Sequence, residues 1–139
     1  MSMSIRNRLP GTVTAVDAGE VMAAVKVRLT GGQEVTAAIT REAVDDLGLS
    51  PGAPVHTLVK STEVALATET LSGVSIRNQL PGTVEGVDTG GAMAAVRVAV
   101  AGGALTAVIT RNAAEELALA PGSPVVALIK STEMSLATG

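Results

Sequence analysis

The chain has 139 residues, 47% of them apolar, and it contains no phenylalanine, tyrosine, tryptophan or cysteine. The lack of cysteine excludes disulfides, zinc-thiolate sites and a thiol nucleophile, and the single histidine, His56, lacks partners for a metal site or a catalytic triad. A formal net charge of −3 gives no positive field that would attract nucleic acid. No leader-like start and no membrane-length apolar run occur, so we expect a cytoplasmic protein.

The first half of the chain predicts five short strands and one short helix. Apolar and polar residues alternate within the second of these strands, as in a half-buried strand, and Gly31-Gly32 predicts the hairpin turn after it. Thr40 occupies the position of a helix N-cap ahead of a helix at 41–47, and Pro51-Gly52 predicts a turn after that helix. The expected strands, in chain order, are 12–16, 23–29, 35–39, 55–60 and 64–67.

The second half of the chain repeats the first. Ser4-Ile5-Arg6-Asn7 returns as Ser75-Ile76-Arg77-Asn78, and Lys60-Ser61-Thr62-Glu63 returns as Lys130-Ser131-Thr132-Glu133. The element order favours an all-β fold with one short helix per repeat, in the form of two tandem OB-like five-stranded β-barrels. Each small barrel would have a weak core without aromatic residues, so we expect an oligomer. The predicted division is a first domain at 1–68, a linker at 69–73 and a second domain at 74–139.

Catalysis finds no support in the sequence. The acidic pairs Asp45-Asp46 and Glu115-Glu116 are adjacent on the predicted helices, so their carboxylates do not face each other. We interpret both pairs as a solvated helix face. Because no Ser-His-Asp set, nucleotide-binding loop or metal cluster can be assembled, the chain is not expected to be an enzyme.

Two short polar stretches stand out in each apolar repeat as hydrogen-bond donors. An arginine offers a planar fork of N–H groups suited to an oxyanion, and a lysine adds a compact charge. One of each supplies the charge that matches a dianion, and each charge-assisted hydrogen bond contributes about 1.5–3 kcal/mol. The candidate residues are Arg6, Asn7, Lys60 and Ser61, with Arg77, Asn78, Lys130 and Ser131 in the second repeat.

A helix start could add to such a site. Thr40 and Thr110 precede the two predicted helices, and a helix N-terminus presents free backbone N–H groups to an anion. The alternative is that these cations are solvated or form weak surface pairs, and that Ser-x-Arg-Asn only begins a strand.

At these residues the sequence resembles the molbindins, which are tandem Mop-domain, TOBE-like proteins. The similar features are the opening Ser-x-Arg-Asn-x-Leu-x-Gly-x-Val, the central Gly-Gly turn, the Ile-Thr-Arg segment before the helix and the closing Lys-Ser. The resemblance covers nearly the whole chain, twice. It implies an OB-like fold for each repeat, a homotrimer, and molybdate or tungstate bound at interfaces between domains.

The resemblance also implies a set of oxyanion ligands. Thr40 and Thr110 match a position near the anion, while Asn7 and Asn78 belong to the same motif and could equally cap a turn. Where some relatives have serine, Ala43 and Ala113 would offer only a backbone N–H. The side chains expected to contact the oxyanion are Ser4, Arg6, Lys60, Ser61, Ser75, Arg77, Lys130 and Ser131.

The function that follows is storage or homeostasis of molybdate or tungstate, with no organic cofactor and no direct metal ligand. The alternative is a regulatory module that senses the oxyanion for a transporter or regulator. Nucleic-acid binding by an OB barrel would require aromatic side chains and a basic groove, which this acidic chain lacks. No membrane partner is expected either.

Overall fold

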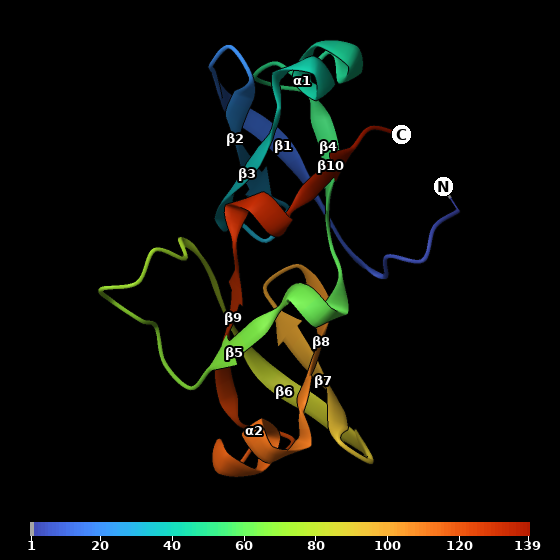
Figure 1. The fold of residues 1–139 in the computed structure, drawn as a ribbon, viewed down its shortest axis with the longest axis vertical. Coiled ribbons are helices and arrows are strands. Elements are labelled where there is room, and N and C mark those ends of the chain that lie inside the picture. The colour runs from blue at the N-terminus through green and yellow to red at the C-terminus, as the bar shows by residue number, and fades with distance from the viewer. Residues whose placement is uncertain (1) are drawn as a thin grey trace.

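The computed structural model describes residues 2–139 and contains two five-stranded antiparallel sheets stacked along the long axis of the molecule (Figure 1). The expected all-β fold with one short helix per repeat is confirmed. The first repeat contains β1 (Asn7–Ala18), β2 (Met22–Leu29), β3 (Glu34–Thr40), α1 (Arg41–Leu47), β4 (Pro54–Val59), the 3-10 turn η1 (Ser61–Glu63) and β5 (Ala65–Ala67). The second contains β6 (Asn78–Gly90), β7 (Met93–Val100), β8 (Gly103–Thr110), α2 (Arg111–Glu116), β9 (Pro124–Ile129), the turn η2 (Ser131–Glu133) and β10 (Ser135–Ala137).

The first strand of each repeat is longer than the sequence pattern predicts. β1 begins at Asn7 because its first half pairs with β4 and its second half pairs with β2. Pro10 fits within the strand, opposite His56. The strand bends where its register with β2 shifts between Val13 and Ala15. The long bent strand therefore joins both sides of the sheet.

The last strand of each repeat belongs to the sheet of the other repeat. The sheet orders are β10-β4-β1-β2-β3 and β5-β9-β6-β7-β8, so β5 and β10 are exchanged. Leu136 of β10 pairs with Thr57 of β4, while Leu66 of β5 pairs with Ala127 of β9. The division into domains at 1–68 and 74–139 stays a prediction about folding units, because neither sheet is built from one repeat alone.

The core consists of small aliphatic side chains and runs through both sheets. Its most deeply buried members include Val25, Val27, Val96, Val98 and Ile129, each 0% exposed. Every second residue of β2 and β7 is buried, which confirms the alternation read from the sequence. Among residues 2–139, no helix has the length and apolar character needed to cross a membrane.

Candidate functional site

The two Lys-Ser motifs lie at the ends of equivalent strands, in the middle of the molecule. Lys60 ends the extended backbone after β4 and caps η1, and Lys130 does the same between β9 and η2. Figure 1 shows η1 and η2 between the two sheets, with α1 and α2 at opposite ends of the molecule. The sequence assigned Lys60 to the fourth strand, but the strand ends one residue earlier, at Val59.

Strand register brings the two polar stretches of each repeat together. Asn7 pairs with Val59 and Asn78 pairs with Ile129. Because the strands are antiparallel, the residue before each asparagine and the residue after its partner leave the ladder at the same end. Arg6 and Lys60 therefore flank one end of the β1–β4 pair, and Arg77 and Lys130 flank one end of the β6–β9 pair, just outside the paired residues.

Three of the predicted ligands of the second repeat line one pocket. Ser75, Lys130 and Ser131 border a cavity of about 250 Å³ together with Ile76 and Thr132. Lys130 is exposed and Ser131 is half-buried, so a small ion can reach both side chains. The lining offers an ammonium group and three hydroxyls, which suits an anion. Thr132 was not among the candidates, although its place in the repeated Lys-Ser-Thr-Glu motif could have identified it.

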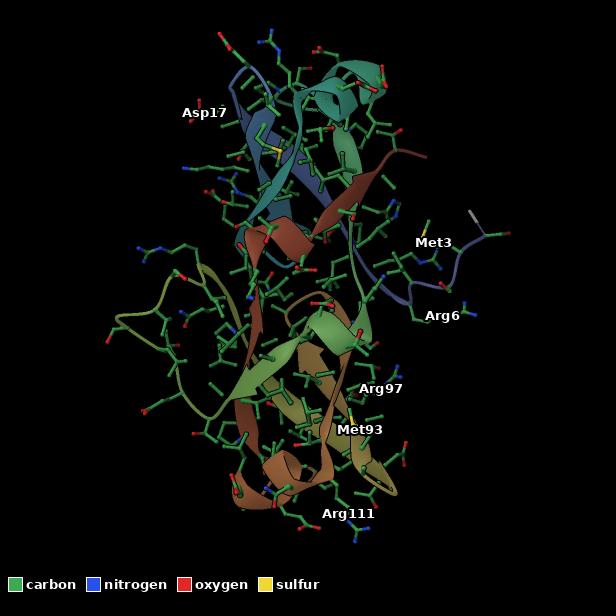
Figure 2. The ribbon with its side chains drawn as sticks, in the orientation of Figure 1. Met3, Arg6, Asp17, Met93, Arg97 and Arg111 are labelled. Carbon is green, nitrogen blue, oxygen red and sulfur yellow. The ribbon has the colours of Figure 1, made fainter. Side chains whose placement is uncertain are left out.

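The first repeat is arranged differently. Lys60 lines a pocket with Ile5 and with residues of both 3-10 turns, among them the carboxylates Glu63 and Glu133. Ser4 and Arg6 are exposed on the N-terminal segment, and the side chain of Arg6 points away from the body of the molecule (Figure 2). The chain by itself therefore does not gather Ser4, Arg6, Lys60 and Ser61 around one cavity.

The two asparagines of the motif are buried and hold the repeats together. Asn7 is 3% exposed and Asn78 is 2% exposed. The amide of Asn7 accepts a hydrogen bond from Thr106 N (2.9 Å) and donates one to Thr106 O (2.8 Å). Asn78 makes the same pair of bonds with the backbone of Thr36, at 2.8 Å each. Asn7 of the first repeat thus binds the edge strand β8 of the second repeat, and Asn78 of the second repeat binds the edge strand β3 of the first.

The predicted helix caps are present, but they lie away from the Lys-Ser turns. Thr40 Oγ1 accepts a hydrogen bond from Ala43 N, and Thr110 Oγ1 accepts one from Ala113 N, both at 3.1 Å. Both helices are at the outer ends of the molecule (Figure 1). Within one chain, the structure does not bring Thr40 or Thr110 to the lysines.

The cations of the two motifs form no ion pair with a carboxylate in the part of the chain that the structure describes. Within residues 2–139 the ion pairs are Arg97–Glu85 and Arg111–Glu115, both exposed. Arg6, Lys60, Arg77 and Lys130 take part in neither pair, although Glu63 and Glu133 line a pocket with Lys60 and Glu63 lines another with Lys130.

Comparison with known proteins places the chain in a family. The TOBE domain model matches residues 3–66 and again 74–136. The molybdenum transport protein ModE of Herbaspirillum seropedicae is 36% identical over 139 residues, which are 99% of this chain and 52% of that protein. The molybdenum-pterin-binding protein MopA of Rhodobacter capsulatus is 39% identical, with coverage of 99% and 52%. The chain spans about half the length of these curated relatives.

One solved structure matches over its whole length. It is the cytoplasmic molybdate-binding protein ModG with molybdate bound, and it superposes with a TM-score of 0.96 at 38% identity, covering 100% of both chains. Both repeats and their relative placement are therefore shared with that protein. The resemblance to tandem molbindins is confirmed: the chain belongs to the TOBE domain family and carries two copies of the domain.

Proposed function

We propose that this chain binds molybdate or tungstate as an oxyanion and serves in cytoplasmic storage or homeostasis, as a binding protein and not an enzyme. The observation that carries the proposal is the pocket in which Ser75, Lys130 and Ser131 converge. The full-length likeness to a structure of ModG with molybdate bound supports it. The proposed ligands are Ser4, Arg6, Lys60 and Ser61, with Ser75, Arg77, Lys130 and Ser131.

The chemistry of the pocket favours a tetrahedral dianion. The ammonium of Lys130 supplies a positive charge, and no carboxylate lines this pocket, although Glu63 lines a neighbouring pocket with Lys130. The hydroxyls of Ser75 and Ser131 supply hydrogen-bond donors beside the ammonium. Arg77 directly precedes β6 at the end of the β6–β9 ladder where Lys130 follows β9, and it would add a second positive charge. Hydrogen bonds to a charged group contribute about 1.5–3 kcal/mol each, so a few of them suffice for tight binding.

The assembly that we propose is a homotrimer in which neighbouring chains complete the sites. Arg6 and Ser4 are exposed on a segment that points away from the body of their own chain (Figure 2). Thr40 and Thr110 begin the helices at the outer ends of the molecule, where a neighbouring chain could bring a Lys-Ser turn to them (Figure 1). The exposed apolar side chains Val21, Met22 and Met93 are also at hairpin ends and would gain burial in an oligomer.

A second candidate function is an oxyanion-sensing module that acts on a transporter or regulator. The observation that favours it is the match to ModE proteins, because this chain corresponds to only 52% of the Herbaspirillum protein. The same site chemistry would serve either role.

A thermal melt tests the proposed binding. We expect molybdate and tungstate to raise the Tm of the purified chain, because a ligand at 100 times its Kd stabilises the folded state by about 2.7 kcal/mol. The Lys60→Ala/Lys130→Ala double variant should lose most of this shift. Lys26→Ala, which removes an exposed lysine of β2, is the matched control and should keep it. No shift of the unaltered chain at saturating molybdate or tungstate would exclude the proposal, and a native mass other than that of a trimer would exclude the proposed assembly.

A further inference from the structure

The amide of Asn7 has a single possible orientation. Its Oδ1 accepts from Thr106 N at 2.9 Å and its Nδ2 donates to Thr106 O at 2.8 Å. A backbone N–H can only donate and a carbonyl can only accept, so exchanging the two ends of the amide would break both bonds. With Asn7 only 3% exposed, water cannot replace them readily. The position of the amide nitrogen is therefore set by the backbone of β8.

The second N–H of this amide faces a proposed ligand. Nδ2 of Asn7 carries two hydrogens, one of which is used by Thr106 O. Ser61 Oγ lies 3.5 Å from Nδ2, at the long end for a hydrogen bond, on the side of the strand end where the Lys-Ser turn begins. Because Nδ2 is only a donor, Ser61 Oγ can meet it only as an acceptor.

We propose that Asn7 is a positioning residue that makes the hydroxyl of Ser61 a hydrogen-bond donor toward the bound oxyanion. A hydroxyl has one hydrogen, and one that accepts from Asn7 keeps that hydrogen free for another acceptor. A fully deprotonated tetrahedral dianion offers only acceptor oxygens and fits this arrangement. Hydrogen phosphate carries a P–OH group, and that protonated oxygen is a poor acceptor for the hydroxyl hydrogen of Ser61. Hydrogen phosphate therefore has one fewer oxygen than molybdate that can accept a hydrogen bond from Ser61. This inference rests on the proposed oxyanion function.

Asn78 provides the comparison that separates this role from a structural one. It makes the same two backbone bonds, with Thr36, and it is equally buried. It lies in the other repeat, and its bonded partner Thr36 belongs to β3. Replacing Asn78 therefore removes an equivalent contact between the repeats without touching the Asn7–Ser61 pair.

A double-mutant cycle on molybdate affinity tests the proposal. It is run in a Lys130→Ala/Ser131→Ala background, so that the remaining binding reports on the first repeat. We expect Asn7→Ala and Ser61→Ala each to raise the Kd for molybdate about tenfold, because each removes or misdirects one hydrogen bond to a charged ligand. If Asn7 acts through Ser61, the Kd of the Asn7→Ala/Ser61→Ala variant for molybdate should not exceed the higher Kd of the two single variants. Ser61→Thr, which keeps a hydroxyl, should retain most of the affinity.

The matched cycle pairs Asn78→Ala with Ser61→Ala, and there the two factors in Kd should multiply. Multiplying factors in the Asn7 cycle as well would overturn the proposal, since a contact between repeats alone would act independently of Ser61. Asn7→Ser, which keeps a polar group but removes both N–H groups of the amide, serves in the same cycle if Asn7→Ala does not fold. An unaltered chain that binds no molybdate contradicts the proposed function itself, whereas binding with independent Asn7 and Ser61 contradicts only this inference.

Discussion

The hairpin turn at Gly31 in the first repeat packs against the turn at Ala101 in the second, and this contact leaves no room for a side chain at residue 31. A Cβ on Gly31 would overlap the carbonyl oxygen of Ala101, and neither backbone can withdraw without moving its hairpin. Gln33 Nε2 donates to the same carbonyl at 3.0 Å, which holds the turns together. We expect Gly31→Ala to lower the free energy of unfolding by about 1–3 kcal/mol, as overpacked sites do. Chemical denaturation of the ligand-free chain measures this change.

Gly86 gives the matched control for that substitution. A Cβ there would meet no atom within 4 Å, and the equivalent position of the first repeat, Ala15, is already alanine. Both residues follow the same register shift in β6 or β1. Gly86→Ala should leave stability unchanged or raise it by up to about 1 kcal/mol. If Gly31→Ala and Gly86→Ala lowered the free energy of unfolding equally, the contact between the turns would not be the reason that residue 31 is glycine.

At the same scale, the sequence identified the donors but not their partners. Donor chemistry, repetition and the family resemblance together marked Lys130 and Ser131, and the structure places both in one pocket with Ser75. Their role as oxyanion ligands stays a prediction. The bonds of Asn7 could not be foreseen, because Thr106 lies 99 positions away and its backbone carries no sequence signal. The sequence did not show that Asn7 is buried at the start of its strand, and this burial is what requires a hydrogen-bond partner for its amide.

Among the elements, the exchanged strands allow a sharp test of which sheet each one stabilises. Leu136 of β10 is 9% exposed and pairs with Thr57 of β4 in the first sheet. Replacing a buried leucine by alanine costs about 2–5 kcal/mol, and the loss should be felt first by the strands in contact with it. We expect Leu136→Ala to speed hydrogen exchange at the amides of β4 more than at those of β9.

Leu66→Ala is the reciprocal variant, because Leu66 of β5 pairs with Ala127 of β9. It should speed exchange in β9 more than in β4. If each substitution instead loosened the sheet of its own repeat, the exchange of strands would be wrong.

The elements differ in how far local sequence determines them. The alternation of β2 and the Gly31-Gly32 turn follow from short-range rules, so both were predicted correctly. The exchange of β5 and β10 was not predicted, because Ala65-Leu66-Ala67 and Ser135-Leu136-Ala137 are so alike that either segment fits either sheet. A 3-10 turn precedes each of these strands, and the residue pattern of the strands does not show which sheet they join.

At the scale of the whole molecule, the exchange makes each repeat depend on the other. A fragment of residues 1–68 would lack β10 for its sheet and would leave β5 without β9. Two copies could satisfy both needs by exchanging β5 with each other, since β5 and β10 are nearly equivalent. We therefore expect this fragment to form a dimer whose Tm rises with protein concentration. Sedimentation velocity and concentration-dependent melting measure the two properties.

The fragment of residues 74–139 should behave in the same way, and mixing the two fragments should yield a heterodimer with the pairing of the intact chain. The bonds of Asn7 with Thr106 and of Asn78 with Thr36 stabilise the mixed pair, because each joins one repeat to the other. Asn7→Ala in the first fragment should weaken the mixed pair, while a substitution at exposed Lys26 should not. A monomeric 1–68 fragment with a concentration-independent Tm would instead mean that the first sheet is stable with four strands. The repeats would then be independent folding units at the boundaries that the sequence predicts.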